Sequence, residues 1–115
     1  MILYDDKNIK GEIAMKKIIK HKLYDTDKAE LVVADRRGYD CGDRWSDNLL
    51  YHTRKGAWFM VKQGGALSCY AERDGRDWVG SSRIEPISEN EACNFCRKYG
   101  DPEDYVNYFP DLMQA

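Results

Sequence analysis

The sequence has no long hydrophobic run and no excess of charge of one sign. No apolar stretch approaches the roughly 20 residues of a membrane-spanning helix, and residues 1–14 lack the apolar core and cleavage site of a secretory signal. We therefore expect a cytoplasmic protein that does not enter a membrane. Lysine and arginine total 18 against 20 aspartates and glutamates, which excludes the chain-wide basic field of a histone or a ribosomal-protein arm.

Complete catalytic motifs are also lacking. The pair Gly64-Gly65 follows a predicted strand, but no Gly-Lys-Ser/Thr comes after it, so a phosphate-binding loop is excluded. His21 and His52 could each act as a general base, yet neither is accompanied by a Ser or Cys in a recognisable nucleophile motif. The sequence therefore predicts a protein that is not an enzyme.

The composition is that of one folded domain. The chain has 115 residues, of which 43% are hydrophobic and 12% aromatic, and this length leaves little room for a second core. Residues 1–14 mix apolar and charged side chains without a period. We predict an N-terminal extension over residues 1–14 and a single α+β domain over residues 15–115.

Alternating and β-branched segments predict an antiparallel sheet of about four to five strands in the first part of the domain. A turn at residues 25–28 is expected to join the first two strands into a hairpin, and a turn at 54–56 is expected to join the next two. The predicted strands cover residues 16–24, 30–35, 48–53 and 57–62, with a continuation of the sheet at 67–72 and a short extended piece at 78–80.

Two helices are predicted after the sheet. Ser88 and Glu91 have the spacing of a capping box, and Gly100 is placed to end the helix that they begin. Asp101 and Pro102 are typical of the start of another helix, which should stop at residues 109–110. An antiparallel sheet followed by two helices is an α+β fold.

Four cysteines are the strongest chemical signal. Cys93 and Cys96 share one face of the first predicted helix, so both thiolates could reach one ion. A tetrahedral structural zinc site needs four ligands, and Cys41 and Cys69 could supply the other two, or His21 or His52 could replace one of them. The alternatives are ordinary buried thiols, since free Cys is among the most buried residue types, and a redox pair or disulfide.

Charge is distributed unevenly along the chain. From Glu85 to the end there are seven acidic residues against two basic ones, whereas residues 15–84 carry fourteen basic and ten acidic ones. In the last helix the acids alternate with aromatic residues, a composition typical of a protein surface that meets a basic partner. The alternative is a helix that packs its apolar side on the sheet and leaves its acids solvated. The predicted partner-binding residues are Glu103, Asp104, Tyr105, Tyr108 and Asp111.

The order of these motifs resembles a family of small proteins of phages, prophages and plasmids of Firmicutes. The resemblance covers residues 15–109, and its motifs are KLYDTDKAELV at 22–32, LLYHTRKGAWF at 49–59, GGALS-x-YA at 64–71 and I-x-PIS-x-x-EA at 84–92. Small acidic-tailed proteins of such elements include anti-CRISPR proteins. The paired cysteines Cys93 and Cys96 depart from the family pattern.

The resemblance implies a phage-encoded protein that acts in the cytoplasm of a bacterial host cell. The function expected from it is non-enzymatic inhibition of a host defence nuclease, a type II Cas effector, by a protein contact that blocks nucleic-acid loading, and direct nucleic-acid binding is not expected. The alternative is a zinc-stabilised nucleic-acid-binding or regulatory module of a mobile element. The basic residues that such a module would use are Arg36, Arg37, Arg44 and Arg54.

Overall fold

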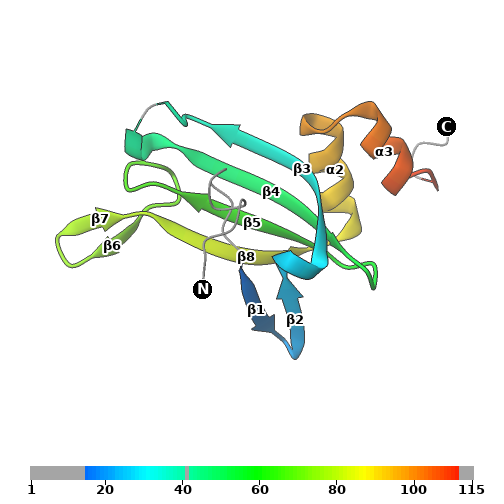
Figure 1. Cartoon of the computed structure of the whole chain (residues 1–115), viewed down its shortest axis with the longest axis horizontal. Coiled ribbons are helices and arrows are strands. Elements are labelled where there is room, and N and C mark those ends of the chain that lie inside the picture. The colour runs from blue at the N-terminus through cyan, green and yellow to red at the C-terminus, as the bar shows by residue number, and fades with distance from the viewer. Residues whose placement is uncertain (1–14, 41, 112–115) are drawn as a thin grey trace.

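The computed structural model describes residues 15–40 and 42–111, and within them a four-stranded antiparallel sheet is followed by two helices (Figure 1). The strand order in this sheet is β3-β4-β5-β8. Two separate two-stranded hairpins, β1-β2 and β6-β7, flank it. The predicted α+β class is confirmed. The elements are β1 (Lys16–Ile19), β2 (Lys22–Asp25), η1 (Thr26–Lys28), β3 (Ala29–Arg37), η2 (Gly42–Arg44), β4 (Ser46–Thr53), β5 (Trp58–Gly64), β6 (Glu72–Asp74), β7 (Asp77–Val79), β8 (Ser81–Ile87), α2 (Glu89–Tyr99) and α3 (Pro102–Tyr108).

Both faces of the main sheet carry a hydrophobic cluster. Side chains alternate between the faces along each strand, so the apolar strands β4 and β5 supply residues to both. On one face Leu50 and Met60 pack against α2 and the end of α3. On the other face Leu49 and Phe59 pack together with residues of the β1-β2 hairpin. The fold is therefore a sheet with helices on one side and a hairpin on the other, as Figure 1 shows.

The hairpin predicted between residues 16–24 and 30–35 is wrong, because β3 pairs with β4 and residues 16–25 form a separate two-stranded sheet. Residues 16–24 do not form one strand, because Lys20 and His21 take positive φ angles of 51° and 67° and turn the chain back on itself. Two successive left-handed residues make the tight turn that suits a two-residue hairpin, and Asn-Gly is its usual sequence signal. Lys-His gives no such signal. The hairpin predicted from residues 48–53 and 57–62 is confirmed by the pairing of β4 with β5.

The segment after β5 also differs from the prediction. Residues 67–71 form turns instead of a strand, and the backbone N–H of Leu67 donates to the Asp43 carbonyl at 2.9 Å. The chain then forms the β6-β7 hairpin, whose residues are all exposed. Strand β8, which the sequence indicated only as the approach to the helix, forms the edge of the sheet. Pro86 fits there because an edge strand has ladder positions that need no N–H donor.

The helix boundaries agree with the predicted signals. The Ser88 hydroxyl accepts from the Glu91 backbone N–H at 3.1 Å, and the Glu91 carboxylate accepts from the Ser88 N–H at 3.1 Å. Gly100 ends α2 where the chain approaches the sheet: a Cβ there would lie 2.9 Å from the Val33 side chain. Pro102 begins α3, which ends before Phe109. No helix in residues 15–40 and 42–111 has the length and apolar character of a membrane span.

Candidate partner-binding site

Helix α2 places Cys93 and Cys96 on its inner side. Both thiols are buried, at 7% and 1% exposure, in the cluster that contains Val33 and Leu50. Burial raises the pKa of the Cys96 thiol to about 11, and the nearby Asp104 carboxylate adds to this shift. A buried, protonated thiol packs as a small apolar side chain. This environment supports the buried-thiol interpretation of the pair.

Of the other two predicted zinc ligands, the structure describes only Cys69, and it does not bring Cys69 to this pair. Cys69 is exposed and lies in the turns after β5, and Cys41 lies outside the residues that the structure describes. In the described part of the chain, no three His, Cys, Asp or Glu side chains gather as a metal site would require. Zinc at the four cysteines therefore stays a prediction.

The aromatic residues of the α3 region turn toward the sheet. Phe109 stacks on Trp58 with ring centroids 5.0 Å apart. Tyr108 makes edge contacts with His52 at 5.4 Å and with Trp58 at 5.6 Å, and its hydroxyl donates to the Glu30 carboxylate. These rings join α3 to β3, β4 and β5, so the position of the helix is set by packing.

Tyr105 is the third ring of this region and contacts α2. It lies 6.0 Å from Phe109 between ring centroids, and a hydrogen bond with Cys93 raises the pKa of the Tyr105 hydroxyl. Tyr105 and Tyr108 are both half-buried. The two tyrosines predicted to bind a partner thus make contacts within the chain. Each keeps a partly exposed surface that a partner could contact.

The three acidic residues predicted to bind a partner differ in their exposure. Glu103 and Asp111 are exposed, whereas Asp104 is half-buried on the side of α2, where its charge acts on Cys96. Glu103 shares the outer side of α3 with Val106, which is 48% exposed, and with Asn107. A shallow cavity of about 310 Å³ is lined there by Pro102, Glu103, Val106 and Asn107. We call these four residues the α3 outer surface.

The sequence did not indicate Asn107, and the alternative of a helix that packs its apolar side on the sheet placed Val106 on that side, whereas Val106 is 48% exposed. The signal that could have found them is helical spacing, because residues three and four positions after Glu103 lie beside it on a helix surface. The aromatic residues drew attention instead, but Phe109 and the two tyrosines serve to hold the helix. The α3 outer surface therefore combines one carboxylate, one exposed aliphatic side chain and one amide on a firmly held helix.

The arginines proposed for the alternative function do not form one surface. Arg37 is exposed on β3, pairs with Asp35 at 3.3 Å and lies over the Tyr99 ring at 5.8 Å. Arg36, its neighbour on the strand, points to the opposite face of the sheet because side chains alternate. Arg44 is exposed in η2 and Arg54 is exposed in the turn between β4 and β5. These four positions are therefore spread over both faces and two loops.

The chain matches no known protein family, no curated protein and no solved structure. The resemblance to small proteins of phages and plasmids thus stays a prediction that rests on the quoted motifs.

Proposed function

We propose that the chain is a non-enzymatic protein of a mobile genetic element that binds a host defence nuclease, a type II Cas effector, and blocks its loading with nucleic acid. The observation that carries the proposal is the α3 outer surface. It exposes a carboxylate and an aliphatic side chain around a shallow cavity, on a helix that the Phe109–Trp58 stack fixes to the sheet. The resemblance to mobile-element proteins supplies the partner class.

A nuclease channel that holds nucleic acid is lined by cations, which gives the proposal its mechanism. Acidic side chains placed on such a surface occupy the positions that phosphates would take, and electrostatic complementarity speeds association. The region from Glu89 to Asp111 carries six carboxylates against two cations. The backbone of α3 is already ordered, so binding through this helix does not require the chain to order its backbone.

Binding and loading are tested together with purified components. A type II Cas effector is titrated with the full chain, and guide RNA or target DNA is added either before or after it. The proposal predicts a 1:1 complex whose affinity falls as salt concentration rises, and less nucleic acid bound when the chain is added first. Failure to bind the tested effectors, or a complex that leaves loading unchanged, would contradict the proposal.

A structural zinc ion is a separate part of this proposal. It is tested by the metal content of protein purified without a chelator, in the natural sequence and in Cys93→Ser and Cys96→Ser variants. One zinc per chain that is lost in both variants, with a lower melting temperature, would support a structural site. Metal-free protein whose cysteines all titrate as free thiols after unfolding would contradict it.

A further inference from the structure

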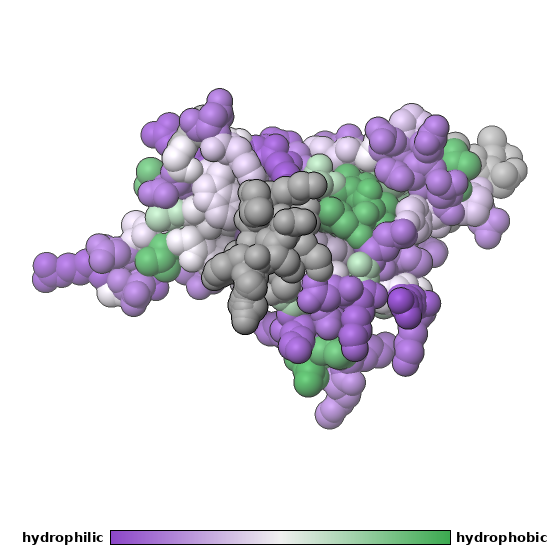
Figure 2. All heavy atoms as spheres, in the orientation of Figure 1, coloured by the Kyte–Doolittle hydropathy of each residue, from purple (hydrophilic) through white to green (hydrophobic). Residues whose placement is uncertain are grey.

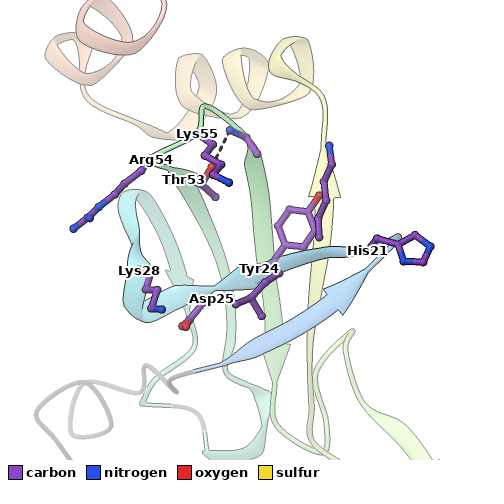
Figure 3. A pocket seen from close by; sticks show the side chains of 10 residues that line it. His21, Tyr24, Asp25, Lys28, Thr53, Arg54 and Lys55 are labelled. Carbon is purple, nitrogen blue, oxygen red and sulfur yellow. Dashed lines mark hydrogen bonds between the residues drawn. The ribbon is translucent and has the colours of Figure 1, made fainter.

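The β1-β2 hairpin and the turn between β4 and β5 enclose a cavity of about 610 Å³ (Figure 3). The hairpin side contributes Lys22, and Lys28 follows in η1. The turn side contributes Arg54 and Lys55. We call this cavity the basic cleft, because these four cations line it together with one carboxylate, that of Asp25.

The basic cleft has an excess of positive charge, because four cations line it against the single carboxylate of Asp25, which also accepts the Asp27 backbone N–H at 2.9 Å and caps η1. Lys28 and Arg54 also line a neighbouring cavity that contains Asp27 and Glu30. The ion pairs found within the described part of the chain join Arg37 to Asp35 and Lys62 to Glu85, and none involves the four cations of the cleft. Several exposed like charges around one hollow attract a polyanion.

The hairpin itself extends this basic surface away from the sheet. Lys16, Lys17 and Lys20 are exposed along it, and His21 lies at its far end (Figure 3). At its base Tyr24 is buried and lies edge-on to Phe59, with ring centroids 5.5 Å apart. The ribbon is therefore anchored at one end and projects from the main sheet at the other, as Figure 1 shows.

An apolar pair interrupts the charge on this ribbon. Ile18 and Leu23 lie opposite each other in the two strands and are 71% and 53% exposed. Figure 2 shows a small hydrophobic patch on the hairpin, surrounded by hydrophilic residues. An anchored ribbon with cations at its edges and an apolar pair between them is complementary to a ligand that offers phosphates on both sides of an apolar contact.

We propose that the hairpin and the basic cleft bind double-stranded DNA, with the hairpin in the major groove and the cations of the cleft on the flanking phosphates. The major groove of B-form DNA, about 12 Å wide, admits a two-stranded β-ribbon, and thymine methyl groups there accept apolar contacts. Lysine and arginine contacts to phosphate position such a ribbon. The major groove of A-form RNA is too deep and narrow for it.

An acidic protein is the less suitable occupant. Protein interfaces draw most of their binding energy from aromatic or arginine anchors that fill pockets. Among the described residues that line the basic cleft, Tyr24 is buried in the protein's own core at 8% exposure, and the one arginine, Arg54, is exposed in the turn between β4 and β5. The cleft therefore offers exposed charge but no anchor held in a desolvated pocket, which suits phosphates. This inference does not depend on the α3 outer surface, which belongs to other elements.

The test measures fluorescence anisotropy of labelled duplex DNA of about 20 base pairs on titration with the full chain, where each phosphate contact adds about −0.9 to the slope of log K against log salt. We expect saturable binding with a slope between about −2 and −4, since four cations line the cleft. Duplex RNA of the same sequence and polyglutamate are expected to bind at least about tenfold more weakly.

Matched charge variants locate the site. The double variant Lys22→Glu/Lys55→Glu should weaken DNA binding by about tenfold or more and reduce the salt slope by about 2. The control Arg76→Glu/Lys98→Glu makes the same change in net charge at exposed positions in the β6-β7 turn and on α2, and it should retain the slope. A circular-dichroism melt of both variants confirms that they fold.

Four results would overturn the inference. They are no binding of duplex DNA at low salt, equal binding of duplex RNA, tighter binding of polyglutamate than of DNA, and equal loss of affinity in the Arg76→Glu/Lys98→Glu control. Tighter binding of polyglutamate would assign the cleft to an acidic protein. None of these outcomes affects binding of a nuclease by the α3 outer surface.

Discussion

Phe109 stacks on Trp58 with ring centroids 5.0 Å apart and ring planes inclined by 21°. Both rings are buried, although Phe109 lies just beyond the last residue of α3 and Trp58 begins β5. The short helix is thus held at its C-terminal end by a residue outside it. The direction in which α3 presents Glu103 and Val106 depends on this contact.

Removal of the Phe109 ring should therefore loosen α3. We expect Phe109→Ala to lower the free energy of unfolding by about 3–5 kcal/mol, because it removes a buried ring and leaves a cavity against Trp58. Urea denaturation followed by tryptophan fluorescence measures this. The control is Val106→Ala on the same helix, whose half-exposed side chain should cost less than about 0.5 kcal/mol. Equal effects of the two changes would contradict the anchoring role of Phe109.

A buried carboxylate holds the opposite end of the sheet. Asp47 is fully buried, and its carboxylate accepts hydrogen bonds from the Tyr39 hydroxyl at 2.6 Å and from the Gln63 side-chain amide at 2.9 Å. We expect Asp47→Ala to cost about 1–3 kcal/mol of stability, because it leaves the Tyr39 hydroxyl and the buried Gln63 amide without this acceptor. The loss is measured by thermal melting of Asp47→Ala. The control is Asp43→Ala, which changes an exposed acid nearby in the sequence. A melting temperature equal to that of the control would show that the cluster adds no stability.

The buried thiol of Cys96 makes stability depend on pH in the alkaline range. Its pKa rises from an ordinary 9.0 to about 11 because burial disfavours the thiolate. The folded state therefore favours the protonated form, so this contribution is fully present below about pH 9 and is lost as pH rises through about 11. At about 1.36 kcal/mol per pKa unit the loss is roughly 3 kcal/mol at most.

Urea denaturation at about pH 8 and about pH 10.5 measures this loss. In Cys96→Ala the difference in stability between the two pH values should shrink. Cys69→Ser, which changes an exposed thiol, should leave it as in the natural sequence. Tyr70 and Tyr105 also have raised pKa values, so part of the alkaline loss should remain in Cys96→Ala. An unchanged pH dependence in that variant would contradict the assignment to Cys96.

Local signals predicted the helices and the central hairpin. The Ser88 and Glu91 capping box, Gly100 and Pro102 act within a few residues of one another, so the sequence displays them directly. Strands β4 and β5 were predictable because their apolar residues are buried on both sides of the sheet. The turn at Lys20 and His21 was missed, since neither residue favours the positive φ angle that it takes there.

The candidate site was predicted only in part. Composition located the acidic residues around Glu103 but could not show that Tyr105 and Tyr108 turn inward, because their partners Cys93 and Glu30 are distant in sequence. The basic cleft was missed for the same reason. Lys22 and Lys55 are 33 positions apart, and antiparallel pairing together with the packed hairpin brings them to one cavity. A count of charges along the sequence does not reveal such a cluster, because its members are distant in the chain.

The most direct test of the proposed function is the dissociation constant of the complex with a type II Cas effector, measured by isothermal titration calorimetry. The decisive variant is Glu103→Lys/Asp111→Lys, and the matched control is Asp74→Lys/Asp77→Lys, which reverses two exposed acids of the β6-β7 hairpin. We expect Glu103→Lys/Asp111→Lys, which changes one residue of the α3 outer surface and one exposed acid just beyond α3, to raise the dissociation constant roughly fivefold or more, while the control stays close to the natural sequence. Equal dissociation constants for the two variants would contradict the proposed function.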